Sequence, residues 1–179
     1  MTRAFVAVHP PESVLDAVAA RVESVELPEA RRTARDQWHL TLQFLGNHVD
    51  IDAVAGALDG LSVAPGPARV GGAGTFPNPR RGRVLWLGIA EGTELLQELA
   101  AAVAARLAPL GYERDGRAYH PHLTLARCKT PADLRGAVAA LGDAPVGDAW
   151  TVGGVVVYES VPARDGAQYT PRASITLSR

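Results

Sequence analysis

The chain lacks two features that would narrow its class at once: a set of cysteines and a strong net charge. Among 179 residues there is one cysteine, Cys128, so no internal disulfide can form. A single thiol is typical of a reducing compartment, and we expect a cytoplasmic protein. The formal net charge is −1. Overall charge therefore does not attract a polyanion, and an anionic partner needs a local basic patch.

Long apolar runs are also missing. The first apolar stretch, residues 4–8, is too short for the hydrophobic region of a signal peptide. No run approaches the roughly 20 apolar residues that a membrane span needs. The remaining composition, 47% hydrophobic and 21% charged, is that of an ordinary globular protein. We expect a soluble, monomeric protein without membrane association, whose length fits one domain with a sizeable core.

One short motif occurs twice in this otherwise ordinary composition. His39-Leu40-Thr41-Leu42 is repeated as His122-Leu123-Thr124-Leu125. In a β-strand, residues i and i+2 face the same side, so each histidine would share a face with the threonine that follows it. The alternative is that both histidines are structural residues on amphipathic strands. The repeat disfavours that alternative, because a strand ordinarily carries valine or isoleucine at such positions.

The elements around the motif repeat in the same order. Strands are predicted at residues 4–9, 39–45, 68–74, 84–89, around His122, at 152–158 and at 173–177; helices are predicted up to about residue 26, from 51, over 94–110 and from 131. Each half reads strand, helix, His-strand, helix, strand. This order predicts an internal duplication, with repeats at about 3–76 and 83–178 inside one two-lobed domain over 1–179. The expected fold is α+β and bilobed, with pseudo-two-fold halves and mainly antiparallel sheets around a central cleft.

Two of the helix starts carry capping signals. Asp50 precedes an apolar pattern and is a candidate N-cap. Thr130-Pro131-Ala132-Asp133 has the form of a capping box with proline at the first helical position. Both signals predict where a helix begins.

Two imidazoles and two hydroxyls in one cleft favour acid–base chemistry on a phosphate. Histidine titrates nearest to neutral pH, so one imidazole can accept a proton while the other donates one. Threonine hydroxyls can donate hydrogen bonds to phosphate oxygens as charge grows on them. No carboxylate pair and no cysteine nucleophile accompanies the motifs. The pattern predicts metal-free cleavage of an activated phosphodiester.

Further candidates accompany the motifs. Arg127, at the end of the second motif, can pair with a phosphate, and Phe76 can stack on a terminal base. Trp38 and Tyr119 are further stacking candidates, although such residues more often belong to the core or to the rim of a site. Two arginine groups could steer an RNA end or be solvated loops: Arg31, Arg32 and Arg35, and Arg80, Arg81 and Arg83. His120 and His122 resemble a metal-binding pair but lack carboxylate or thiol partners at ligand spacing, so we expect no metal.

These residues resemble a known family, the two-histidine phosphoesterases. Trp38-His39-Leu40-Thr41-Leu42-Gln43-Phe44-Leu45-Gly46 and His120-Pro121-His122-Leu123-Thr124-Leu125-Ala126-Arg127 look like its two HxTx signatures. The bacterial and archaeal RNA 2′,3′-cyclic phosphodiesterases, also called 2′-5′ RNA ligases, are the most similar subfamily. Phe76-Pro77-Asn78-Pro79-Arg80-Arg81, Val84–Gly88 and Tyr158-Glu159-Ser160 fit that subfamily too. One departure is Ala34-Arg35-Asp36-Gln37, where many members carry a proline-rich segment.

The resemblance implies the reaction and the role of each residue. The substrate would be an RNA end with a 2′,3′-cyclic phosphate, hydrolysed to a 2′-phosphate without metal or cofactor. His39 would be the proton donor to the leaving 3′-oxygen, and His122 the acceptor that activates water. Thr41 and Thr124 would hold the phosphate oxygens. Some members also join RNA ends without ATP.

The residues themselves leave two things open. They do not say which histidine is the acid and which is the base. They also leave other functions possible: a cyclic phosphodiesterase for a small nucleotide metabolite, a non-catalytic RNA-binding module, and, least favoured, a metallohydrolase.

Overall fold

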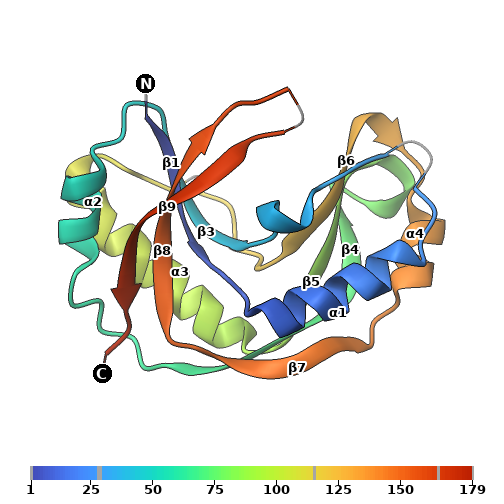
Figure 1. Cartoon of the computed structure of the whole chain (residues 1–179), viewed down its shortest axis with the longest axis horizontal. Coiled ribbons are helices and arrows are strands. Elements are labelled where there is room, and N and C mark those ends of the chain that lie inside the picture. The colour runs from blue at the N-terminus through green and yellow to red at the C-terminus, as the bar shows by residue number, and fades with distance from the viewer. Residues whose placement is uncertain (1, 28–29, 115, 165, 179) are drawn as a thin grey trace.

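The computed structural model describes residues 2–27, 30–114, 116–164 and 166–178 as a curved antiparallel sheet with helices on its flanks (Figure 1). The strands run in the order β7-β4-β5-β6-β3-β1-β8-β9, with β2 paired to β6 beside this path. Their bounds are β1 (Arg3–Val8), β2 (Ala30–Arg32), β3 (Leu40–Gly46), β4 (Gly66–Phe76), β5 (Gly82–Glu91), β6 (Leu123–Ala132), β7 (Pro145–Val152), β8 (Gly154–Val161) and β9 (Gln168–Thr176). The predicted α+β class with mainly antiparallel pairing is confirmed.

Helices and short 3₁₀ turns connect the strands. The α-helices are α1 (Glu12–Glu23), α2 (Ile51–Leu58), α3 (Thr93–Leu107) and α4 (Arg135–Leu141). The 3₁₀ turns are η1 (Arg35–Gln37), η2 (Pro79–Arg81) and η3 (Ala108–Leu110). None of the helices in the described part of the chain is long and apolar enough to cross a bilayer.

The two motif strands, β3 and β6, are neighbours at the centre of the sheet. They meet through a single antiparallel residue pair, Leu40 and Leu123. Beyond this pair the strands diverge, and β2 takes over the edge of β6, where its three residues pair with Ala126, Arg127 and Cys128. The sheet therefore consists of two four-stranded parts, β3-β1-β8-β9 and β7-β4-β5-β6, which one residue pair joins, and β2 is the ninth strand, added to β6.

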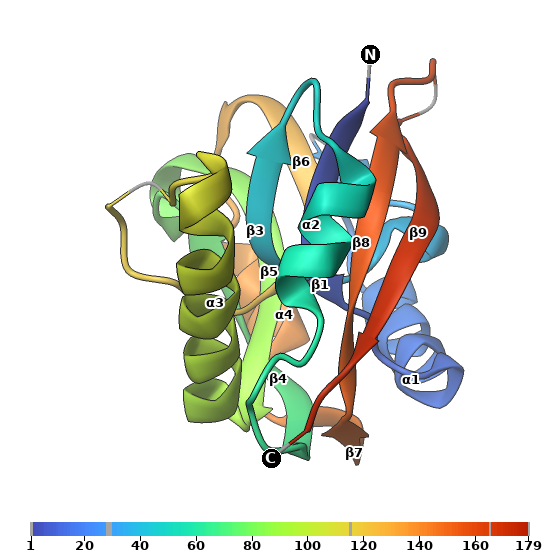
Figure 2. The same ribbon diagram turned by 90° about the vertical axis from the view of Figure 1, so that its left-hand side faces the viewer.

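The helices divide between these two parts, which are the two lobes of the molecule. α2 and α3 pack on each other and on β9 and β3, and Figure 2 shows both helices in front of that lobe. α1 packs on β7 and α4 on β4, beside the other lobe (Figure 1). The lobes do not coincide with the halves of the sequence, because α1 and β4 lie with the second-half strands while α3 lies with β3. The repeat boundaries at 3–76 and 83–178 stay a prediction.

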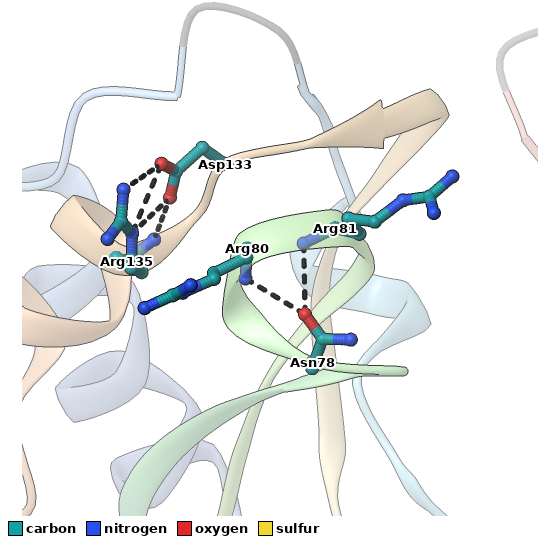
Figure 3. Close-up of polar contacts among 5 residues, drawn as sticks. All are labelled: Asn78, Arg80, Arg81, Asp133 and Arg135. Atoms are coloured by element: carbon teal, nitrogen blue, oxygen red, sulfur yellow. Dashed lines mark hydrogen bonds and ion pairs between the residues drawn. The ribbon is translucent and has the colours of Figure 1, made fainter.

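One capping prediction is confirmed and the other is wrong. The Asp50 carboxylate accepts the backbone N–H of Ala53, so Asp50 is the N-cap of α2. The segment Thr130–Asp133 is not a capping box, because β6 continues to Ala132, which pairs with Gly82. α4 begins only at Arg135, whose backbone N–H and side chain donate to Asp133 (Figure 3). Sheet pairing overrides the local helix signal here.

Two strands were not predicted from the sequence. β2 contains Arg31 and Arg32, where no strand was predicted, and β7 precedes the predicted strand at 152–158. Neither has the apolar alternation of a half-buried strand, since β2 has only three residues and β7 contains proline and glycine. Pairing with an existing strand edge is what orders both.

The residue pair that joins the lobes lies in the middle of the core. Leu40 and Leu123 are both fully buried, as are Leu85, Leu87 and Leu125 on the same and neighbouring strands. These leucines face inward on alternate positions, which leaves the intervening histidines and threonines on the opposite face. Core packing thus aligns the face that carries the motifs.

We expect Leu123→Ala to lower the free energy of unfolding by about 2–5 kcal/mol, because it removes a buried side chain and leaves a cavity between the lobes. Urea unfolding followed by circular dichroism measures this change. Leu110→Ala is the matched control, since Leu110 is 42% exposed and its truncation should cost about 1 kcal/mol or less. Equal losses in the two variants would contradict the central role of the Leu40–Leu123 contact.

Candidate active site

The four motif side chains surround one cavity of about 620 Å³. His39 and His122 come directly before β3 and β6, one residue outside the strands in which they were predicted. Because Leu40 and Leu123 pair antiparallel, the continued register places His39 next to Thr124 and Thr41 next to His122. Each end of the cavity thus holds one imidazole and one hydroxyl, taken from different strands.

A matching irregularity lies at the last residue of each motif. Two consecutive residues of β1 pair with Gln43 and Thr41 of β3 and skip the leucine between them. In the same way, two consecutive residues of β5 pair with Ala126 and Thr124 of β6. The intervening leucine in each strand is therefore the extra residue of a β-bulge, which shifts the alternation of the strand by one. Gln43 and Ala126 turn into the core, and Phe44 and Arg127 turn onto the cavity. Without the bulge, Arg127 would point into the core.

Aromatic rings and a backbone carbonyl hold His122 in place. Its Nδ1 lies 2.7 Å from the carbonyl oxygen of His120. A carbonyl only accepts, so Nδ1 carries the proton and Nε2 keeps a free lone pair. The Phe76 ring meets the imidazole edge-on at 5.0 Å, and Trp86 lies at 6.1 Å. Burial lowers the pKa of His122, against the opposing effect of its hydrogen bond to the His120 carbonyl, and the positive charge of Arg127 acts in the same direction as burial.

His39 has a similar setting in the other lobe. It stacks on Phe5 with ring centroids 4.6 Å apart, and Tyr169 meets it edge-on at 5.1 Å. The backbone of Gln37 hydrogen-bonds the imidazole, two residues before it, as His120 does for His122. Burial lowers the pKa of His39 to about 4, despite the opposing effect of the Gln37 hydrogen bond. Both imidazoles are therefore neutral at pH 7 in the free protein.

Comparison with known proteins gives one consistent family. The family model of the 2′-5′ RNA ligase superfamily matches residues 11–162. The chain belongs to this superfamily. The RNA 2′,3′-cyclic phosphodiesterase of Escherichia coli strain K12 is 34% identical over 149 residues, which cover 80% of this chain and 78% of the relative. That of Aeropyrum pernix is 31% identical over 144 residues, which cover 77% and 81%.

Solved structures agree with this superfamily assignment. A crystal structure of a phosphoesterase has a TM-score of 0.80 at 27% identity and covers 99% of both chains. Escherichia coli LigT complexed with 3′-AMP has a TM-score of 0.79 at 26% identity, with the same coverage. The fold of this superfamily member is thus shared over essentially its whole length.

The two further candidates for substrate contact lie apart. Arg127 lines the cavity with the four motif residues. Phe76 does not; it lies behind His122 and lines an adjoining cavity of about 740 Å³, which shares Thr41, Phe44 and His122 with the first. Trp38 is 5% exposed and belongs to the core. Tyr119 lines the adjoining cavity, with the Arg114 guanidinium 5.3 Å from its ring centre.

In each of the two arginine groups, some side chains line a cavity and others do not. Arg80 and Arg81 are exposed on η2, where Asn78 accepts their backbone N–H groups, and neither lines the two cavities (Figure 3). Arg83 lines the adjoining cavity. In the other group, Arg35 forms ion pairs with Glu12 and Asp16 on α1. Arg32 donates hydrogen bonds to the carbonyl oxygens of Val22, in the last turn of α1, and Val25, just after it. Arg31 lines the first cavity.

A metal site would need more ligands than His120 and His122 supply. Across the described ranges, no group of three or more histidine, cysteine, aspartate or glutamate side chains lies close enough to hold an ion. His120 and His122 thus have no third partner among those side chains, and the His122 Nδ1 is engaged by a carbonyl. The absence of a metal from the reaction stays a prediction.

Several cavity residues were not predicted from the sequence. Phe5 and Tyr169 back His39, and Phe44 is 64% exposed at the cavity wall. Phe44 occupies the position after the first motif that Arg127 occupies after the second, so aligning the two repeats beyond the tetrapeptide is the signal that finds it. Phe5 and Tyr169 come from distant strands and carry no such local signal.

We expect the His39 imidazole to titrate near pH 4 in the free protein, because burial against Phe5 disfavours the charged form. Phe5→Leu removes the stacked ring, lets water reach the imidazole and raises its pKa towards 6.5. NMR titration of the histidine ring signals, assigned with His39→Gln, measures both values. A midpoint near 6.5 in the unsubstituted protein would show that burial does not control this group.

Proposed function

We propose that this protein hydrolyses the 2′,3′-cyclic phosphate at an RNA end to a 2′-phosphate, using two histidines and no metal. The observation that carries the proposal is the convergence of His39, His122, Thr41 and Thr124 on one cavity from two strands. Relatives named RNA 2′,3′-cyclic phosphodiesterase supply the substrate class. Structures of LigT with 3′-AMP and with phosphate fit a nucleotide-binding cleft.

In the proposed reaction, water attacks phosphorus and the bond to the 3′-oxygen breaks. His122 Nε2 takes the proton from water, which its fixed tautomer allows. His39 gives its proton to the departing 3′-oxygen, so the product has a 3′-hydroxyl and a 2′-phosphate. The acid and base roles follow the family, because both imidazoles have similar surroundings. Each proton transfer contributes roughly 10²–10⁴-fold to the rate.

Thr41, Thr124 and Arg127 would stabilise the phosphate as negative charge builds on its oxygens. The hydroxyls donate hydrogen bonds from opposite ends of the cavity, and the Arg127 guanidinium supplies a fixed positive charge. Phe76 would not stack on a base in this reaction. Its ring would instead hold the His122 imidazole in position from behind. Joining of RNA ends would be the same step with the 5′-hydroxyl of a second RNA in place of water. That hydroxyl attacks phosphorus and gives its proton to His122, and the bond to the 3′-oxygen breaks, which leaves a 2′-5′ phosphodiester and a 3′-hydroxyl.

The low pKa of His39 has a mechanistic consequence. A proton donor must be protonated, and burial works against that in the free protein. A bound phosphate anion adjacent to the imidazole raises its pKa, because opposite charge favours the charged form. Substrate would therefore help to load the acid with its proton.

Other functions remain distinguishable by experiment. A small cyclic nucleotide as the natural substrate predicts turnover of mononucleotides at least equal to that of oligonucleotides. A non-catalytic RNA-binding module predicts binding without hydrolysis, unaffected by histidine substitution. A metallohydrolase predicts loss of activity in a chelator such as EDTA, whereas we expect full activity there. The monomeric state and the cytoplasmic location also stay predictions.

We expect His39→Ala and His122→Ala each to reduce hydrolysis of a cyclic-phosphate-ended oligonucleotide by at least about 10²-fold, since each removes one proton-transfer group. Product analysis by chromatography should give a 2′-phosphate and no 3′-phosphate. His48→Ala is the control, because His48 is exposed and lines neither cavity. Near-normal turnover in either motif variant would refute the two-histidine mechanism.

The pH dependence should report the two imidazoles. In the free enzyme a protonated His39 becomes scarcer as the pH rises above about 4, and a neutral His122 becomes scarcer as the pH falls. We therefore expect a bell-shaped kcat/KM profile with its maximum below pH 6.5. The alkaline limb of kcat should lie at higher pH than that of kcat/KM, because bound phosphate raises the pKa of His39. Coincident alkaline limbs would mean that the phosphate does not act on this group.

A further inference from the structure

The first cavity carries more positive charge than one cyclic phosphate requires. Its lining includes the four arginines Arg3, Arg31, Arg32 and Arg127, and no aspartate or glutamate. A cyclic phosphodiester has a single negative charge. In the proposed reaction, Arg127 and a protonated His39 already offset it. The remaining arginines therefore call for a further anion.

Arg31 is the best placed of the remaining arginines. It lies directly opposite Arg127 in the antiparallel pairing of β2 with β6, so both side chains stand on the same face. Like charges directly opposite each other are destabilising. Neither guanidinium has a hydrogen-bonded or ion-paired partner among the described side chains, whereas Arg32 is engaged by the carbonyls of Val22 and Val25. A facing pair of this kind suits a bound anion between or beside the two groups.

The position of this pair relative to the catalytic groups indicates which anion it is. Arg127 follows Thr124 along β6, and β3 leaves the Leu40–Leu123 pair in the opposite direction. The Arg31–Arg127 pair therefore lies at one end of the catalytic set and not across its middle. A group bound there would be next to the reacting phosphate. In an RNA chain, that group is the neighbouring phosphodiester.

We propose that Arg31 binds the phosphodiester one nucleotide before the cyclic end, so that the preferred substrate is an oligonucleotide and not a cyclic mononucleotide. The proposal rests on the hydrolysis proposed above and deepens it. Guanidinium suits this task, because its planar fork matches two phosphate oxygens and it is weakly hydrated. The edge position of β2 leaves Arg31 exposed to incoming chain.

The experiment compares two substrates in three proteins. A trinucleotide ending in a 2′,3′-cyclic phosphate and the cyclic mononucleotide of its last base are hydrolysed by the unsubstituted protein, Arg31→Gln and Arg31→Lys. We expect Arg31→Gln to reduce the ratio of the kcat/KM values, trinucleotide over mononucleotide, by roughly tenfold through loss of one charge-assisted contact. Arg31→Lys should restore part of the ratio, because it keeps the charge but loses the planar fork. Arg81→Gln is the matched control for removal of an exposed arginine outside both cavities.

Salt dependence gives a second readout that a merely structural role would not move. Each phosphate contact to a single strand contributes about −0.7 to the slope of log affinity against log salt. Equilibrium binding of the product trinucleotide with a 2′-phosphate, measured by fluorescence anisotropy between 50 and 300 mM salt, should lose about that much slope in Arg31→Gln. Arg81→Gln should keep the slope of the unsubstituted protein.

Each outcome decides a different claim. An unchanged ratio and slope in Arg31→Gln, or equal losses on both substrates, would overturn the subsite, the latter because Arg31 would then act at the cyclic phosphate itself. Absence of hydrolysis of either substrate by the unsubstituted protein would overturn the proposed function. In that case the binding arm still decides whether Arg31 contacts a phosphate of the chain.

Discussion

The single contact between Leu40 and Leu123 is the constraint on which the site depends. It is the one point at which the motif strands pair, and its antiparallel register sets each histidine beside the threonine of the other strand. Divergence of the strands beyond it leaves room for the cavity, and β2 covers the edge of β6 that β3 no longer occupies. The pairing of two fully buried leucines thus determines the spacing of four polar side chains on the opposite face of the sheet.

Hydrophobic packing and charge act together at the cavity. Phe5 and Tyr169 on one side and Phe76 and Trp86 on the other hold the imidazoles and keep them partly out of water. This lowers the pKa of each histidine and leaves both imidazoles neutral at pH 7 in the free protein. Four arginines line the same cavity and give it a positive charge that does not depend on the histidines. Aromatic support of the imidazoles and guanidinium charge are therefore complementary features of one cavity, as the proposed phosphate site requires.

The sequence was sufficient for the features that depend on period and composition. The two-residue spacing of His39–Thr41 and His122–Thr124 predicted a shared face, and the repeated element order predicted the α+β class. It was not sufficient where neighbouring strands decide the outcome. The direction of Arg127 depends on a bulge that only the register with β5 reveals. The Thr130–Asp133 signal failed because pairing of Ala132 with Gly82 outweighs a local helix preference. The place of Arg31 opposite Arg127 depends on the pairing of β2 with the edge of β6, which no pattern in the sequence indicates.

Each lobe contains strands and helices from both halves of the sequence, and this limits where the chain could be cut into two fragments that fold. α1 and β4 from the first half complete the β5-β6-β7 lobe, while α3 from the second half and the β8–β9 hairpin complete the β1-β3 lobe. A cut between β4 and β5 would therefore yield two fragments that each lack strands and a helix of both lobes. Neither fragment could bury its own leucines, so folding would require their association. The predicted repeat therefore does not correspond to two units that fold separately, and a split version would regain its site only when the two fragments associate.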